Sequence, residues 1–135
     1  MDYHINIDDY FEVKKEFREM WTEYAEGLVE NYDNLILVAI EDDKIIGVMD
    51  GRLENRAPIY KIEKIGRIGT NFVLPEYRSK GVFTCLLDEM LKWMEKKGVE
   101  YVEHPIAAKN KLGRTVWKKK GFEDSTVFTR RKISI

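Results

Sequence analysis

The sequence predicts a mixed α/β fold, in which helices pack against a sheet that contains both antiparallel and parallel strands. Apolar residues recur at helical spacing from about residue 8 to 28 and again from about 80 to 97. Apolar, β-branched runs bounded by polar turn residues lie between these segments and after them. Hydrophobic residues make up 44% of the 135 residues, which is enough to fill one core, so we expect a single domain over residues 1–135.

The first half of the chain is expected to form one helical segment followed by strands. The elements are, in order, a short strand at residues 3–7, a helix or a broken pair of helices from about 8 to 28, a hairpin of strands at 34–40 and 45–53, and a strand at about 60–73. Asp8 or Asp9 is placed to cap the start of the helix. The polar residues 41–44 separate the two hairpin strands, as a turn requires.

The second half is expected to alternate helices and strands. The elements are, in order, a helix at about 80–97, a strand at 99–104, a helix at 110–120, and closing strands at 121–123 and 126–133. Gly98 suits the left-handed position that commonly ends a helix, and Asn110 suits the N-cap of the next one. Antiparallel strands followed by strand, helix and strand fit a mixed sheet.

The most informative segment is residues 73–83, where a strand runs into a basic, glycine-containing turn that opens a helix. The first N–H groups of a helix have no internal partner and lie at its positive dipole end. A phosphate that binds there accepts hydrogen bonds from these groups and is attracted by the dipole. Gly81 lets the backbone come close to a ligand, while Arg78 and Lys80 add long-range attraction. The structural alternative is a surface loop with two solvated cations.

A second motif lies at residues 110–122, where an asparagine, a small residue, an aromatic residue and a Gly-Phe pair follow one another at set spacings. Together the two segments resemble the GNAT family of N-acetyltransferases. The two signatures of the family fall on Arg78, Gly81 and Phe83, and on Asn110, Gly113, Trp117, Gly121 and Phe122. These motifs cover about the C-terminal half of the chain, whereas upstream the likeness lies only in the order of the elements.

The resemblance implies the fold and the activity of that family. The fold is α+β, with a central, mixed, mostly antiparallel twisted sheet of about six or seven strands flanked by helices, and a coenzyme A (CoA) cleft between splayed central strands. The activity is transfer of an acetyl group from acetyl-CoA to a primary amine, on a small cationic molecule or a peptide, by direct attack in a ternary complex. The alternative is a catalytically silent domain that binds CoA or an acyl-CoA as a sensor or partner module.

The resemblance also assigns residues to the acetyl-CoA site. The residues implied are Phe72, Val73, Arg78, Ser79, Lys80, Gly81, Val82, Phe83, Thr84, Asn110 and Trp117. Backbone N–H groups around Phe72 and Val73 would polarise the thioester carbonyl, where the strand splays from its neighbour. Asn110 would contact the pantetheine arm as well as capping its helix, and Thr84 would donate its hydroxyl to a phosphate.

Two positions depart from the family pattern. Phe83 stands where Gly or Ala is usual, but it shares helical spacing with Leu86 and Met90, so we expect its ring to pack inward. Trp117 replaces the tyrosine that commonly protonates the departing thiolate, and an indole has no exchangeable hydroxyl. Because a thiol has a pKa near 8.5 and leaves as a tolerable anion, this loss costs only about 2 kcal/mol.

The acceptor must also lose a proton before it can attack. An alkyl amine with a pKa near 10.4 is charged at neutral pH, and supplying the free base costs roughly 4.6 kcal/mol. His104 is the first candidate for the general base, because its ordinary pKa lies near neutrality and Pro105 holds it extended at a strand end. Glu63 is the second candidate, Glu103 and Tyr60 are further rivals of His104, and a chain of waters is also possible. A structural or exposed histidine is the alternative for His104.

The net charge of −1 conceals two oppositely charged halves. Residues 1–55 carry 15 acidic and 5 basic side chains, whereas residues 56–135 carry 9 acidic and 18 basic. The acidic half would attract a cationic acceptor, although acidic residues also simply solvate exposed helix faces. The run of lysines at residues 118–120 lies near a helix C-terminus, where cations are favoured, and does not indicate a nucleic-acid site.

The cysteine content and the length of the apolar runs indicate in which cellular compartment we expect the protein. Cys85 is the only cysteine, so it makes no internal disulfide and cannot form a zinc site by itself. We therefore expect no metal and a reducing, cytoplasmic location. No apolar run is long enough to span a bilayer and the first residues lack the features of a secretory signal, so no membrane partner is expected. A homodimer is left open.

Overall fold

The computed structural model describes residues 33–134, so the predicted strand at residues 3–7 and the predicted helix at 8–28 lie outside the described residues. The described residues fall into two compact units, 33–105 and 106–134.

The first unit is built on a hairpin whose turn is determined by two aspartates. Strand β1 (Asn34–Glu41) pairs antiparallel with β2 (Lys44–Asn55), as the sequence predicts. Asp42 and Asp43 connect them with φ of 50° and 61°. Aspartate tolerates the left-handed region, and two such residues match the right-handed twist of the strands they join.

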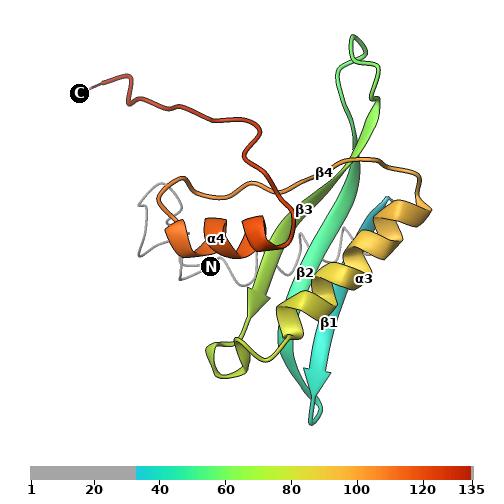
Figure 1. Cartoon of the computed structure of the whole chain (residues 1–135), viewed down its shortest axis with the longest axis vertical. Coiled ribbons are helices and arrows are strands. Elements are labelled where there is room, and N and C mark those ends of the chain that lie inside the picture. Colours follow the sequence, from blue (N-terminus) through green and yellow to red (C-terminus); the bar gives the residue numbers. More distant parts are fainter. Residues whose placement is uncertain (1–32, 135) are drawn as a thin grey trace. The chain divides into compact units, whose positions relative to one another are not determined.

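The sheet is mixed, as predicted, and has four strands within the described residues (Figure 1). Strand β3 (Lys64–Val73) pairs antiparallel with β2, and β4 (Val102–Glu103) pairs parallel with β3, giving the order β1-β2-β3-β4. The predicted strand at 99–104 is shortened to two residues. Its first residue, Val99, instead donates its N–H to the carbonyl of Met94 and finishes the preceding helix.

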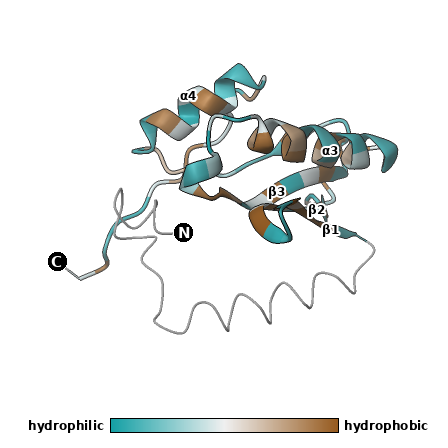
Figure 2. Cartoon of the chain, turned by 90° about the horizontal axis from the view of Figure 1, so that it is seen from below, coloured by the Kyte–Doolittle hydropathy of each residue, from teal (hydrophilic) through white to brown (hydrophobic). Residues whose placement is uncertain are grey.

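Helix α3 (Val82–Lys96) lies along one face of this sheet (Figure 2). Its buried residues recur at helical spacing and are Leu86, Leu87, Met90 and Met94. These side chains pack against glycines of the sheet. A Cβ on Gly51 would lie 2.4 Å from the sulfur of Met90, so Met90 packs directly on the strand backbone because Gly51 has no side chain. The helix ends at Gly98 (φ 81°), whose N–H bonds the carbonyl of Glu95, which confirms the predicted left-handed C-cap.

The second unit contains helix α4 (Lys111–Lys119) and an extended tail. The predicted strands at residues 121–123 and 126–133 are wrong, because residues 122–132 form neither helix nor strand. Residues 121 and 122 are used to close α4. In the tail, Val127, Phe128 and Ile133 are 81%, 90% and 91% exposed. Residues that favour a strand form one only where a partner pairs with their backbone, and none does so within the described residues.

Candidate active site

The turn before α3 holds a set of backbone donors that have no partner among the described residues. A short 3₁₀ helix (Pro75–Tyr77) follows β3, and Ser79 (φ 62°) and Gly81 (φ 89°) then turn the chain into α3. The first helical hydrogen bond runs from the N–H of Cys85 to the carbonyl of Gly81. Within residues 33–134, the N–H groups of residues 79–82 donate no hydrogen bond. This arrangement is the open, positive helix end that the sequence predicts.

Arg78 fixes this turn to the end of β3. Its Nε donates to the carbonyl of Val73 at 3.0 Å, and its guanidinium carbon lies 5.4 Å from the ring centre of Phe72. Its backbone N–H donates to the carbonyl of Pro75 at 3.3 Å. Arg78 is therefore tied back to the strand instead of only attracting anions from a distance, while Lys80 is exposed with its Nζ 5.7 Å from the ring centre of Tyr77.

The turn opens on a groove of about 530 Å³ between α3 and β1. The groove is lined by residues of β1 and β2, the turn and the first turns of α3, namely Leu37, Val38, Ala39, Ile40, Glu41, Ile46, Tyr77, Lys80, Gly81, Val82, Cys85, Leu86 and Glu89. Two of the unbonded donors, those of Gly81 and Val82, belong to residues that border it. A Cβ on Gly81 would meet no other atom within 4 Å, so this backbone is accessible to a ligand.

Strand β3 carries a bulge that decides which of its amides face away from β2. Met49 pairs with Asn71 and Gly51 pairs with Ile68, so residues 69 and 70 both stand opposite Asp50. Beyond the bulge, the N–H of Leu74 donates to the carbonyl of Ile46. Hydrogen-bonded pairs alternate in an antiparallel ladder, so residue 72 also faces β2. By this alternation, the amides of residues 71 and 73 face away from β2, and the donor role of the N–H groups around Phe72 and Val73 stays a prediction.

His104 lies at the point where β4 leaves β3. The two strands pair only at Gly66 with Val102 and at Arg67 with Glu103. At the next position, Nδ1 of His104 lies 3.3 Å from the carbonyl oxygen of Ile68. A carbonyl accepts only, so this contact requires the proton on Nδ1 and, in the neutral ring, leaves a basic lone pair on Nε2.

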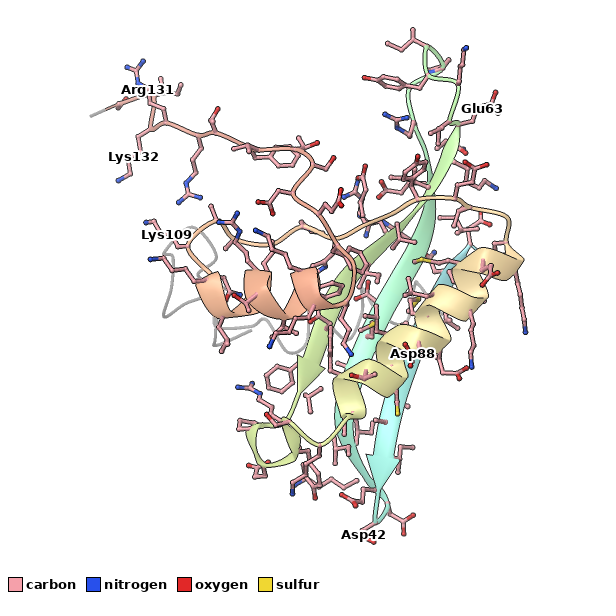
Figure 3. All side chains as sticks on the ribbon, in the orientation of Figure 1. Asp42, Glu63, Asp88, Lys109, Arg131 and Lys132 are labelled. Carbon is pink, nitrogen blue, oxygen red and sulfur yellow. The ribbon has the colours of Figure 1, made fainter. Side chains whose placement is uncertain are left out.

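The other candidate bases lie elsewhere or are engaged. Glu63 is exposed and precedes β3, at the end of the sheet opposite the turn at Asp42 (Figure 3). Five residues of strand separate Glu63 from Ile68, about 16 Å, so the structure does not bring Glu63 and His104 together. Glu103 accepts a hydrogen bond from Nη2 of Arg67 at 2.8 Å, and the ring of Tyr60 lies 3.9 Å from the guanidinium carbon of Arg56.

A charged ladder crosses the sheet on the face opposite α3. Glu54 accepts hydrogen bonds from Nε of Arg52 at 2.6 Å and from Nε of Arg67 at 2.8 Å, and Arg67 continues to Glu103. Burial raises the pKa of Glu54, but the hydrogen bonds from the two arginines outweigh it, so the pKa lies below its ordinary value of 4.5. These ion pairs link β2, β3 and β4, so the carboxylate of Glu103 has a structural role in the sheet.

In the second unit, the second motif closes both ends of α4. The side chain of Asn110 accepts the N–H of Gly113 at 2.9 Å, which confirms the predicted N-cap. At the other end, Gly121 (φ 92°) and Phe122 donate to the carbonyls of Lys118 and Trp117. The rings of Trp117 and Phe122 meet edge to face at 4.9 Å, the apolar contact that accompanies this type of cap. Trp117 is buried and serves this packing.

Sequence reasoning missed Asp50 and Asn71. Asp50 is 2% exposed within an otherwise apolar stretch of β2, and a lone acid in such a strand was the signal that could have found it. Asn71 had no signal, because the direction of its amide depends on the bulge.

Within residues 33–134, no helix is long and apolar enough to cross a membrane, and no group of three or more His, Cys, Asp and Glu side chains could hold a metal ion. Residues 3–122 match the acetyltransferase (GNAT) family. An uncharacterized N-acetyltransferase of Methanocaldococcus jannaschii is 27% identical over 121 residues, which are 90% of this chain and 52% of that protein. The chain thus spans about half the length of this curated relative.

Solved structures with the same fold include a predicted acetyltransferase of Clostridium acetobutylicum with acetyl-CoA (23% identical, TM-score 0.76, covering 97% of this chain and 84% of that one). Another is the aminoglycoside N-acetyltransferase AAC(6')-Iy in complex with CoA (21% identical, TM-score 0.70, covering 87% of this chain and 92% of that one). A third is the apo aminoglycoside 6'-N-acetyltransferase AAC(6')-IG of Acinetobacter haemolyticus (18% identical, TM-score 0.73, covering 96% of this chain and 90% of that one). With residues 3–122 matched to the family, the chain belongs to the acetyltransferase (GNAT) family.

Proposed function

We propose that the protein is an acetyl-CoA-dependent N-acetyltransferase that acetylates a primary amine. The observation that carries this proposal is the row of backbone N–H groups at residues 79–82, which have no partner in the described structure and stand at the start of α3. A diphosphate needs several converging donors and a positive potential, and this helix end offers both. The chemistry of these donors fits CoA.

The outward amides of residues 71 and 73 are the groups we assign to the acetyl end. They lie on the part of β3 that β4 no longer covers, since pairing stops at Glu103. Backbone donors held in a strand are already oriented, so they stabilise a developing oxyanion without reorganising. When bound, acetyl-CoA supplies a thioester carbon to which the amine nitrogen bonds as the carbon–sulfur bond breaks, giving an amide and the CoA thiol.

His104 is the general base in this proposal. The contact of Nδ1 with Ile68 orients the ring and, in the neutral tautomer, makes Nε2 the basic nitrogen to which we assign the proton of the ammonium. Trp117 is buried against Phe122 and provides no hydroxyl to the leaving thiolate. The thiolate therefore leaves unprotonated, at the modest cost that its pKa near 8.5 implies.

For the acceptor we propose a small cationic molecule or a peptide amine. The acidic surplus of residues 1–55 favours a cation by raising its local concentration. Two of the similar solved structures are aminoglycoside N-acetyltransferases, which makes amino sugars a sensible part of the first panel.

The test combines calorimetry with an activity assay. Calorimetry should show binding of CoA and acetyl-CoA, and thiol release should appear with at least one member of a panel of polyamines, amino sugars and peptide amines. Binding without turnover on any amine would favour the silent sensor module. The absence of CoA binding would overturn both readings.

His104→Asn distinguishes the role of His104 as a base from its role in the fold, because the Asn amide can still donate to the carbonyl of Ile68 while the basic Nε2 is removed. We expect turnover at pH 7 to fall by about 100-fold, and the deficit to shrink as the pH rises and the acceptor loses its proton to water. An unchanged pH profile would remove His104 from the mechanism.

A further inference from the structure

A buried acid on β2 fills the bulge of β3. Asp50 is 2% exposed, and its Oδ2 accepts the N–H of Thr70 at 2.9 Å. Thr70 is one of the two bulge residues that stand opposite Asp50, where the regular ladder is interrupted. The side chain of Asp50 therefore takes a strand amide that the interrupted ladder does not bond.

The other bulge residue, Gly69, leaves room for this carboxyl. A Cβ on Gly69 would lie 2.4 Å from Oδ1 of Asp50 and 3.3 Å from its Cγ, and the three nearest atoms all belong to Asp50. A Cβ at position 69 would thus first collide with the carboxyl of Asp50. Asp50, Gly69 and Thr70 form one interlocked unit, which we call the bulge cluster.

The bulge cluster sets the direction of the amides that follow it. Before the bulge, even-numbered residues face β4: the N–H of Gly66 donates to the carbonyl of Tyr101, and the carbonyl of Ile68 contacts His104. After the bulge, even-numbered residues face β2, as the bond from Leu74 to Ile46 shows. The extra residue therefore turns the amides of residues 71 and 73 toward the side of β3 on which β4 pairs only as far as Arg67.

We propose that Asp50 is a positioning residue for acetyl transfer: by holding the bulge, it aims the amides of Asn71 and Val73 at the thioester carbonyl. This inference rests on the proposed function. Asp50 acts through the backbone, so it should affect the chemical step more than the binding of CoA, whose diphosphate is held at residues 79–82. Misplacing prepared donors by about 1 Å can cost on the order of 100-fold in rate.

The experiment compares Asp50→Ala, Asp50→Asn, Gly69→Ala and the double variant Asp50→Ala/Gly69→Ala. We expect Asp50→Ala to lower kcat by about 10- to 100-fold, with CoA affinity within about twofold of wild type. Asp50→Asn keeps an oxygen for the Thr70 N–H and should stay within about threefold of wild type in kcat. Gly69→Ala should resemble Asp50→Ala, and the double variant should be no worse than either, since the Cβ then meets no carboxyl.

Met49→Leu, in the buried neighbour of Asp50, is the control for a general loss of packing. Assayed at a temperature where every variant is folded, it should keep its kcat. A native kcat in Asp50→Ala would overturn the proposal, and so would an Asp50→Asn variant as slow as Asp50→Ala, which would mean that the charge itself is needed.

Amide NMR keeps this test separate from that of the proposed function. If wild type binds acetyl-CoA without turnover, acetyl-CoA should still shift the amide resonances of residues 71 and 73 more than CoA does, and Asp50→Ala should remove that difference. If CoA does not bind, the proposed function fails, and this role of Asp50 is overturned with it. The Thr70 amide resonance, expected to move upfield in Asp50→Ala, then still reports whether Asp50 holds the bulge.

Discussion

The two α-helices of the described structure begin in opposite ways. At α4, the side chain of Asn110 accepts the N–H of Gly113 and closes the helix end within the protein. At α3, the N-cap is Gly81 in the left-handed conformation, no side chain caps the end, and the N–H groups of residues 79–82 have no partner in the described structure. An uncapped helix end costs stability unless something satisfies it. The difference marks which end is built for structure and which for a ligand.

The C-terminal ends sharpen the contrast, because both are closed. Gly98 and Gly121 take positive φ, and each donates to a carbonyl of the last helical turn. In each case the next residue, Val99 or Phe122, completes the cap with a second bond. Among the described residues, the start of α3 is the one of these four helix ends that keeps a row of unbonded backbone donors.

Glutamate at this open end should have the largest effect. Gly81→Glu places a carboxylate where we infer that the diphosphate binds, so CoA affinity should fall by more than about 100-fold, to below detection by calorimetry. Gly98→Glu is the matched control, since Gly98 also has positive φ and open space around its Cβ position.

Both glutamate variants carry the same backbone strain and should lose about 1–2 kcal/mol in their free energy of unfolding. Only Gly81→Glu should lose CoA. Equal affinities in the two variants would show that the diphosphate binds elsewhere and that the open end of α3 is an ordinary surface turn.

The closed end of α4 should respond in stability. Asn110→Ala removes the acceptor of the Gly113 N–H and should lower the free energy of unfolding by about 1 kcal/mol, while Asn110→Asp, an equally good cap, should not. Hydrogen exchange at the Gly113 amide, followed by NMR, checks this directly. If that amide stays equally protected in Asn110→Ala, the side chain is not the cap and the two helix starts are not opposites.

Features determined by neighbouring residues could be predicted from the sequence. The aspartate turn of the hairpin, the glycine that ends α3 and the cap at Asn110 each follow from local conformational preferences, and all three are found in the structure. The open turn at residues 78–81 follows in the same way, from Gly81 and the strand before it.

Features that depend on pairing between distant segments could not be predicted. The bulge opposite Asp50 inverts the direction of every amide after it, and no residue of β3 alone reveals that inversion. The tail at residues 123–134 contains β-branched and aromatic residues that favour a strand but has no pairing partner among the described residues, so its composition alone misled. The charge of Arg78 predicts that it attracts anions, but in the structure its Nε donates a hydrogen bond to the carbonyl of Val73, a contact that the sequence does not reveal.

The smallest expected effect concerns the acid side chain that follows the closed C-terminus of α4. Oδ2 of Asp124 lies 2.6 Å from Nη2 of Arg114 and 3.6 Å from Nζ of Lys118. The hydrogen bond from Arg114 lowers the pKa of Asp124 below its ordinary value of 3.8. Because the folded pKa is the lower one, the stabilisation is present above about pH 4 and is lost as the pH falls through the folded pKa.

Asp124→Asn should therefore remove part of the acid sensitivity of α4 without changing its helicity at pH 7. Chemical shifts of residues 114–122, followed from pH 6 down to about pH 2.5, should move less in Asp124→Asn than in wild type. Added salt should reduce the difference, since the pair is exposed and screened. If wild type and variant titrate alike, the glycine cap and the packing of Trp117 on Phe122 close this helix end unaided, and the contrast with the open start of α3 rests on backbone geometry alone.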